Sequence, residues 1–276
     1  MKKMRKGDIV GRISYGKDII FIIERIDKLS DGKEIAILKG ITERIKVDSE
    51  INDLCKIGKK ELIEKQNKLD TEIEKRILRN LKKEQIEDDR STLKVVTGKI
   101  LHLDGDKKYS EKSQTYYQKM GLTAIVKNIP ENKQSKVVYS LLQYYQPDIL
   151  VITGHDGMIR KTSGYNDIYN YRNSRHFIET VKEARRYDEK HGKKLVIFAG
   201  ACQSYFEALM DAGANFASSP ARILIDFLDP LVVAKSIALT DKNKYIIIDD
   251  FVDELRDGKK GIDGIGARGK KNVILL

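Results

Sequence analysis

The chain has 276 residues, of which 41% are apolar, 34% are charged and only four are proline, a composition that excludes a wholly disordered protein. No segment approaches the roughly 18 consecutive apolar residues that a membrane helix requires, so we expect no membrane insertion. The two cysteines, Cys55 and Cys202, form neither a disulfide framework nor a metal-binding motif. We therefore expect a cytoplasmic protein without metal or cofactor.

The net charge of +11 is spread along the chain instead of being gathered at one site. Basic residues exceed acidic ones by 3 in residues 1–58, by 2 in residues 59–94 and by 6 in residues 95–276. A nucleic-acid-binding protein usually concentrates its basic residues and carries a recognisable binding motif. The sequence has no such motif, and we expect no nucleic-acid partner.

Residues 1–58 have the pattern of a small β-structure. Short runs rich in Ile and Val are separated by turn signals, among them Gly16, the Asp31-Gly32 pair and Gly40. We expect strands within residues 7–13, 18–26, 34–41 and 43–48. Four or five strands in so short a segment favour an SH3-like barrel domain, which usually serves for docking or packing.

Residues 59–94 contain neither Gly nor Pro and are more than half charged. A partial apolar stripe at helical spacing comprises Leu62, Ile73, Ile77, Leu78 and Leu81. This pattern predicts a charged helix that links two domains. A coiled-coil dimerisation arm is the alternative, but it needs a longer heptad run.

From residue 95 onward, short β-branched runs alternate with helical patterns. This alternation predicts an α/β domain over residues 95–276, with a mostly parallel sheet covered by helices on both faces. Strands are expected within residues 94–105, 123–129, 148–154, 194–200 and 215–219, and helices within residues 110–121, 132–146, 174–192, 203–213 and 229–239.

Chemically active side chains follow several of the predicted strands. In open parallel sheets, ligands and catalytic groups gather at the carboxyl ends of the strands, so these residues are expected at one edge. They are Asp104 and Asp106 after the first strand, His155 and Asp156 after the third, Cys202 after the fourth, and Ser218 and Ser219 after the fifth.

Cys202 and His155 are the residues with the clearest chemical meaning. A cysteine attacks as the thiolate, and a nearby imidazole can take its proton and later protonate a leaving amine. A helix expected to begin near Gln203 would favour the thiolate through its dipole. The alternative is that Cys202 is a small buried hydrophobic residue and His155 an ordinary loop histidine.

The order of motifs resembles that of the caspase-like cysteine peptidases. His155 follows an apolar run and has a glycine close after it, and Cys202 follows an apolar run and an Ala. The 47 residues between His155 and Cys202 are close to the separation found in caspases. More narrowly, the whole chain resembles the YabG family of sporulation-specific peptidases. The segments that carry this resemblance are LHLDGD, DILVITGHDG, FAGACQSY and NFASSPARILIDFLDPL.

The resemblance implies an arginine-directed cysteine endopeptidase of the mother cell. Its protein substrates would be spore-coat and related proteins, and it would lie in the cytoplasm or associate with the coat. The α/β domain would then have a caspase-like sheet. His155 would be the general base, Cys202 the nucleophile, and the backbone amides of Gly157 and Cys202 the oxyanion hole. Asp156 would not be a third catalytic residue.

The sequence departs from the wider caspase-like group at Gly200, where an acidic residue often helps to bind a basic substrate side chain. A pocket for arginine still needs a carboxylate, because guanidinium pairs best with a charged bidentate partner. Asp104 and Asp106 are the first candidates, and Ser218 and Ser219 would line the opposite wall. The two aspartates also fit an ordinary Asp-Gly turn.

Two other functions compete with the peptidase. An amidotransferase-like cysteine hydrolase would need G-x-C-x-G and a later H-x-E, and the segment GACQS lacks the final glycine. A non-catalytic coat scaffold would use the barrel and helix to recruit partners. The presence of both His155 and Cys202 favours the enzyme.

Overall fold

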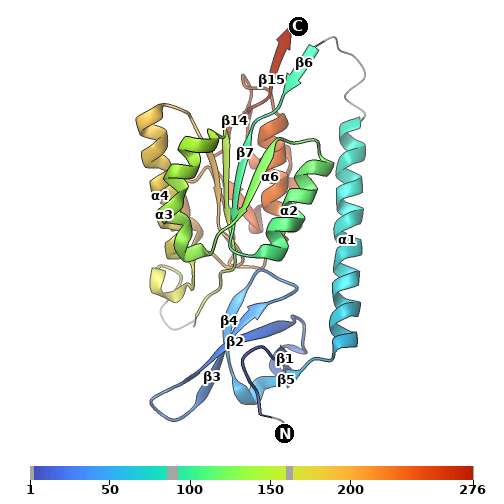
Figure 1. Ribbon diagram of the computed structural model, residues 1–276, viewed down its shortest axis with the longest axis vertical. Coiled ribbons are helices and arrows are strands. Elements are labelled where there is room, and N and C mark those ends of the chain that lie inside the picture. Colours follow the sequence, from blue (N-terminus) through green and yellow to red (C-terminus); the bar gives the residue numbers. More distant parts are fainter. Residues whose placement is uncertain (1–2, 86–92, 160–163, 276) are drawn as a thin grey trace.

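The computed structural model describes residues 3–85, 93–159 and 164–275 (Figure 1). Its N-terminal part is a five-stranded antiparallel sheet in the order β4-β3-β2-β1-β5. Alternate side chains of these strands, such as Val10, Phe21 and Leu38, form a common apolar core. An antiparallel sheet is thus confirmed here, whereas its SH3-like closure stays a prediction. The strands are β1 (Ile9–Arg12), β2 (Phe21–Lys28), β3 (Glu34–Gly40), β4 (Lys46–Glu50) and β5 (Leu54–Lys56).

The strand expected at residues 43–48 begins later than predicted. Residues 41–45 form a turn between β3 and β4, and the amide of Gly40 donates to the carbonyl of Ile45. The apolar Ile45 is buried in the cluster of the N-terminal sheet, while its backbone forms a bridge with Asp156 in the larger part of the molecule. We refer to residues 39–46, which comprise this turn and three flanking strand residues, as the β3–β4 turn.

Helix α1 (Lys59–Gln85) confirms the predicted helix and runs beside α2 (Lys107–Lys119) (Figure 1). Ile73 and Ile77 pack against the core, but Leu78 is 57% exposed, so the expected stripe is narrower than predicted. Arg76 also holds the helix against the larger part of the molecule, because it forms ion pairs with Asp226 and Asp229. The side chain of Leu81 lies outside the described residues.

The larger sheet has six strands in the order β13-β11-β10-β9-β7-β8. The first five along the chain are parallel and β13 is antiparallel, which confirms the expected mostly parallel sheet. The chain passes from β7 to β8 on one side and then to β9 on the other, which makes the carboxyl edge between β7 and β9 a topological switch point. The strands are β7 (Ile100–Asp104), β8 (Ala124–Asn128), β9 (Ile149–Thr153), β10 (Val196–Ala199), β11 (Phe216–Ser218) and β13 (Ile262–Gly264).

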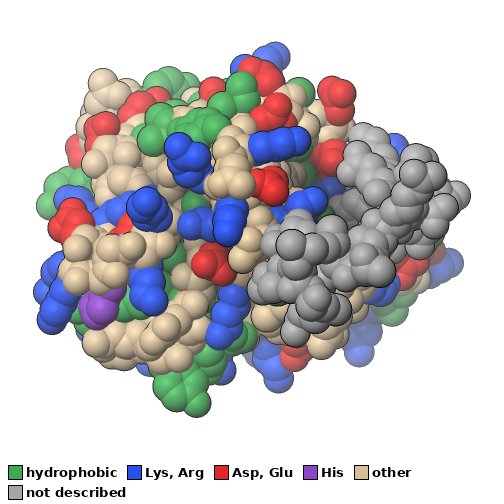
Figure 2. Space-filling view, turned by 90° about the horizontal axis from the view of Figure 1, so that it is seen from above, with side chains coloured by type: hydrophobic (Ala, Val, Ile, Leu, Met, Phe, Trp, Pro, Cys, Tyr) green, Lys and Arg blue, Asp and Glu red, His purple; other side chains and the backbone are tan. Residues whose placement is uncertain are grey.

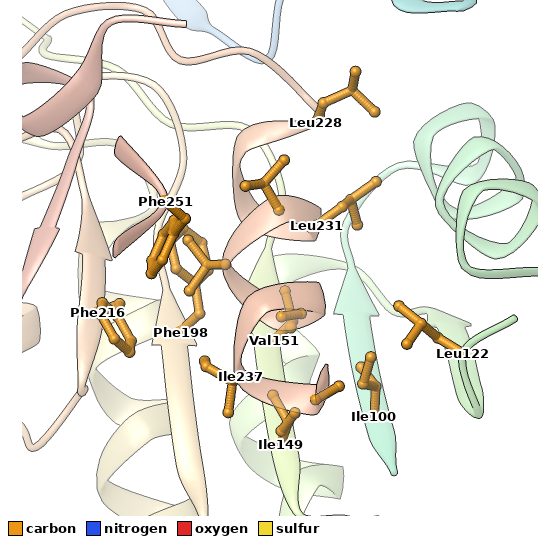
Figure 3. Close-up of a cluster of buried hydrophobic side chains, with 14 of the residues drawn as sticks. Ile100, Leu122, Ile149, Val151, Phe198, Phe216, Leu228, Leu231, Ile237 and Phe251 are labelled. Carbon is orange, nitrogen blue, oxygen red and sulfur yellow. The ribbon is translucent and has the colours of Figure 1, made fainter. Parts of the chain in front are cut away.

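Helices cover both faces of this sheet, as the alternating pattern predicted. Ile149 and Val151 face one apolar cluster, which includes residues of α2 and α6 (Asp229–Leu239). Figure 3 shows how Ile149 and Val151 lie beside Leu231 and Ile237 of α6. Leu150 and Ile152 face the other cluster, which includes residues of the remaining helices. These are α3 (Glu131–Tyr145), α4 (Ser174–His191) and α5 (Phe206–Asp211).

Two small antiparallel ribbons complete the fold. The strand expected over residues 94–105 is divided, because β6 (Leu93–Val96) leaves the sheet and pairs with β15 (Asn272–Leu275) near the C-terminus. A second ribbon joins β12 (Tyr245–Ile246) to β14 (Ala267–Arg268). Seen from this end, Lys and Arg side chains are scattered with Asp and Glu among them (Figure 2). Within the described residues, no helix combines the length and apolar character needed to cross a membrane.

We predict that Phe198→Ala lowers the free energy of unfolding by about 3–5 kcal/mol, because it leaves a cavity in the fully buried cluster of Figure 3. Urea unfolding followed by circular dichroism measures this change. Tyr144→Ala is the matched control: its ring is 79% exposed, so its effect should stay within about 0.5 kcal/mol. Equal effects of the two substitutions would contradict this assignment of the core.

Candidate active site

The candidate active site lies where the N-terminal sheet meets the carboxyl edge of the larger sheet. The β3–β4 turn contacts the segment that follows β9: Ile45 forms a parallel bridge with Asp156, and the amide of Lys46 donates to the Asp156 carbonyl at 2.8 Å. His155 and Asp156 therefore lie against a part of the chain that precedes them by more than 100 residues in sequence.

His155 is held in one orientation by its surroundings. Its Nε2 donates to the carbonyl of Gly40 at 3.3 Å, which leaves Nδ1 as the unprotonated nitrogen of the neutral ring. Nδ1 has no hydrogen-bond partner among the described residues. The backbone amide of His155 donates to Glu131 Oε1 at 2.8 Å, and its carbonyl accepts from Asn173. Burial, with the nearby positive charge of Lys39, lowers the pKa of the imidazole to about 3.

Cys202 is completely buried. Its Sγ accepts a hydrogen bond from the Ile225 amide at 3.4 Å and donates to the Ile225 carbonyl at 3.7 Å. Burial raises the pKa of the thiol to about 12. Cys202 and Ile225 also belong to the apolar cluster of the N-terminal sheet, together with Phe21 and Leu38. The thiol is therefore protonated and sealed at neutral pH in this structure.

Tyr109 packs against one of the two predicted catalytic residues. Its ring meets the His155 ring edge-on with 6.1 Å between centroids. Within the described part of the chain, no hydrogen bond joins the His155 ring to the Cys202 thiol. The structure thus places these two residues after the neighbouring strands β9 and β10, without a hydrogen bond between their described side chains.

The expectation that a helix begins beside Cys202 is wrong. Gln203 has a positive φ of 55°, and α5 begins only at Phe206 and has six residues. The chain turns here because the Ala201 amide donates to the Ser204 hydroxyl and the Gln203 amide donates to the Ile223 carbonyl. In the part of the chain that the structure describes, no helix therefore begins against the thiol to favour its ionised form.

Asp104 is at the centre of a buried polar group of side chains. Arg44 Nη2 donates to its Oδ2 at 2.6 Å, and the two side chains are 1% and 0% exposed. The Thr153 hydroxyl donates to the same carboxylate at 2.9 Å, and the Asp106 amide donates to its other oxygen at 2.8 Å. His102 continues this group through its Nε2, 2.7 Å from the Thr153 hydroxyl.

Asp106 has a structural role as well as a position at the site. Its carboxylate caps α2 by accepting from the amides of Lys108 and Tyr109, as an Asp-Gly turn before a helix would. It also pairs with Lys39 at 2.5 Å. Burial acts to raise its pKa, but the hydrogen bond from Lys39 and the nearby His155 outweigh it, so the pKa is lowered.

Ser218 and Ser219 are both fully buried and bonded to backbone. The Ser218 hydroxyl donates to the Ala201 carbonyl at 2.8 Å, and the Ser219 hydroxyl donates to the Ile223 carbonyl at 2.7 Å. These bonds hold the two segments that enclose Cys202. The serines thus support residues 201–204, which we call the cysteine turn, and their buried hydroxyls bond to backbone carbonyls.

Asp156 was expected at this edge but not as a third catalytic residue, and in the structure its side chain links the loops of the site. Its carboxylate accepts from the Gly157 amide and the Ser174 and Ser204 hydroxyls, and also from the Asn173 amide. Ser204 belongs to the cysteine turn and Ser174 begins α4. Burial raises the pKa of Asp156 to about 6, although these hydrogen bonds oppose it. No hydrogen bond to the His155 ring is among its contacts.

Sequence reasoning missed Arg44, Thr153 and Glu131. Nothing in their local pattern distinguishes them, because their partners lie 60, 49 and 24 residues away. The only usable signal for Thr153 was its place at the end of a predicted strand. Across the described residues, no group of three or more His, Cys, Asp or Glu side chains is arranged to hold a metal ion.

We predict that the native protein hides the Cys202 thiol from alkylation. At pH 7.5, Cys55 should react with iodoacetamide at least ~100-fold faster than Cys202, because only a minute fraction of a thiol with so high a pKa is thiolate. Mass spectrometry of the two cysteine peptides after timed labelling gives both rates. In urea the two rates should converge, and equal rates in native buffer would contradict the sealed thiol.

We also predict an acid-dependent loss of stability that depends on His155. Because its folded-state pKa is below the ordinary value of 6.5, the unfolded chain binds more protons, so stability falls as the pH drops from about 6.5 towards 3. Between pH 6.5 and pH 4 this loss should be about 3 kcal/mol larger in the wild type than in His155→Gln. Urea unfolding at both pH values tests this, and parallel losses would refute it.

The comparison with known proteins identifies the family. The family described as YabG peptidase U57 matches residues 5–274. The sporulation-specific protease YabG of Bacillus subtilis (strain 168) is 39% identical over 275 residues, which cover 95% of this chain and 94% of that protein. No solved structure gives a significant match. The chain therefore belongs to the YabG family of sporulation peptidases and is an enzyme that hydrolyses peptide bonds.

Proposed function

We propose that this peptidase is a cysteine endopeptidase in which Cys202 is the nucleophile and His155 the general base. The observation that carries the proposal is the placement of the two residues after the neighbouring parallel strands β9 and β10, with Nδ1 of the His155 ring left without a hydrogen-bond partner among the described residues. Counted from β7, these are the third and fourth strands along the chain. This is the arrangement that the caspase-like resemblance implies.

The mechanism follows from the chemistry of the two side chains. Nδ1 of His155 takes the proton of the Cys202 thiol, and the thiolate attacks the carbonyl carbon of the scissile bond. The imidazolium then protonates the leaving amine, and water hydrolyses the thioester. The backbone amide of Cys202 stabilises the oxyanion. The Gly157 amide joins it only after leaving the Asp156 carboxylate, to which it donates here at 2.9 Å.

We assign the preference for arginine to Asp104 and Asp106. Both carboxylates stand at the end of β7, beside His155 at the switch point of the sheet. A carboxylate in a site closed to water binds guanidinium through charge-assisted hydrogen bonds, which an ammonium group matches poorly in geometry. Arginine-containing spore-coat and related proteins are the substrates that we propose, by analogy with the sporulation-specific relative.

We infer the following organisation for the whole chain. Residues 1–58 form an SH3-like docking domain, residues 59–94 a linker, and residues 95–276 a caspase-like peptidase domain. The enzyme acts in the mother cell, in its cytoplasm or at the spore coat, without a cofactor. A non-catalytic scaffold is disfavoured by membership of a peptidase family.

The first test is cleavage of fluorogenic peptides with Arg, Lys, Asp or Asn before the scissile bond. We expect cleavage after Arg, with kcat/KM reduced by at least ~10³-fold in Cys202→Ala and in His155→Ala, because either change removes the nucleophile or its base. Cys55→Ser is the matched control and should keep full activity. Cleavage after Arg that survives Cys202→Ala would place the nucleophile elsewhere.

A further inference from the structure

The β3–β4 turn presents two cations to the two aspartates of the proposed arginine site. Arg44 pairs with Asp104 in a completely buried contact of 2.6 Å. Lys39, at the other end of the turn, pairs with Asp106 at 2.5 Å, and this second pair is partly exposed. Both carboxylates that would receive a substrate side chain are therefore already neutralised by the chain itself.

The backbone of the same turn lies against the catalytic histidine. The Gly40 carbonyl accepts from His155 Nε2, and Lys46 bonds to the carbonyl of Asp156. The approach is so close that a Cβ at Gly157 would stand 2.3 Å from the Lys46 carbonyl oxygen. A peptide substrate passing along the histidine would therefore collide with this turn.

The guanidinium of Arg44 is only partly satisfied where it lies. Its Nη2 bonds to Asp104, while Nε and Nη1 have no hydrogen-bond partner among the described residues. Buried donors are usually bonded, and a buried ion pair stabilises little when its other donors are left without acceptors. Arg44 thus behaves as a replaceable occupant of a site that a fully bonded guanidinium would fill better.

We propose that the β3–β4 turn is an internal blocker of the active site, in which Arg44 occupies the position of the substrate arginine. This inference rests on the proposed function and deepens it, because it assigns Asp104 as the residue that binds the substrate guanidinium. The structure is then the latent form of the enzyme. Hydrolysis requires the turn to leave the carboxyl edge and to expose His155 and Cys202.

The test uses the full chain with Cys55→Ser, so that Cys202 is the only thiol. Arg44→Gln and Lys39→Gln each remove one ion pair that holds the β3–β4 turn against the aspartates. Arg25→Gln is the matched control, because Arg25 lies in the same sheet but pairs on the surface with Asp27. Each protein is assayed twice, by the alkylation rate of Cys202 and by hydrolysis of a peptide with Arg before the scissile bond. Circular dichroism shows which variants are folded.

We expect Arg44→Gln to raise both rates by about tenfold or more, since losing a charged hydrogen bond favours the open form by that factor. Lys39→Gln should raise both by about two- to fivefold, because its pair is partly solvated. Arg25→Gln should change neither rate. If Arg44→Gln does not fold, the increase in Lys39→Gln alone decides the proposal.

Agmatine, a small molecule that carries a guanidinium, tests the assignment of Asp104. It should slow alkylation of Cys202 in Arg44→Gln and have no such effect in the wild type, where Arg44 fills the site. Failure to slow alkylation in a folded Arg44→Gln protein would overturn the assignment of Asp104 to substrate arginine.

The two assays separate the blocker from the proposed function. Faster alkylation without cleavage of any peptide would uphold the blocker and refute the cysteine endopeptidase that cuts after arginine. Equal cleavage by the wild type and all three variants would uphold the peptidase and overturn the blocker. Reduced cleavage with unchanged alkylation in folded Arg44→Gln would also overturn it, because the turn would then complete the active site.

Discussion

The buried ion pair between Arg44 and Asp104 is the contact on which the arrangement of the molecule depends. Removing two charges from water costs more free energy than their attraction alone returns, so such a pair persists only with additional support. Here the support comes from the Thr153 hydroxyl, the Asp106 amide and the ring of Tyr109, whose centroid is 5.2 Å from the Arg44 guanidinium carbon. When the turn leaves, another guanidinium has to take the place of Arg44, because Asp104 would otherwise stay buried without a charged partner.

This pair also explains the unusual ionisation of the site. It fixes the β3–β4 turn against the carboxyl edge, and the turn excludes water from His155 and Cys202. In dry surroundings both groups prefer their neutral forms, which moves the pKa of the histidine down and that of the thiol up. A thiol and imidazole that are both neutral and separated lack the activated state of a working nucleophile. Latency and low reactivity are thus two results of one packing arrangement.

Much of the fold could be predicted because its signals are local. The buried run at residues 148–154 and the amphipathic pattern at residues 174–192 gave β9 and α4 almost to the residue, with Gly192 ending the helix in a left-handed conformation. The predicted start of α5 was wrong because the Ser204 hydroxyl accepts from the Ala201 amide within a turn instead of capping a helix. The pairing of β6 with β15 was not predicted, since it joins residues about 180 apart.

The candidate site was predictable only as a set of positions. Strand ends place His155, Cys202 and Asp104 at one edge, and that follows from the parallel sheet. Their burial does not follow from it, because the cover comes from a distant turn without a recognisable motif. In the sequence, Arg44 resembles any other basic residue of a charged segment. Its role can be recognised only from the structure, which shows its buried pair with Asp104.

The ribbon of β6 and β15 brings together the start and the end of the part of the chain that contains the larger sheet. In Figure 1 this ribbon lies at the opposite end of the molecule from the N-terminal sheet. Units whose two ends are adjacent tolerate insertion, permutation and fusion, because foreign chain attached there does not cross their core. The β6–β15 ribbon, where other segments could be attached, is far from the β3–β4 turn that covers the candidate active site. A segment attached beside this ribbon would therefore lie far from both the turn and the site.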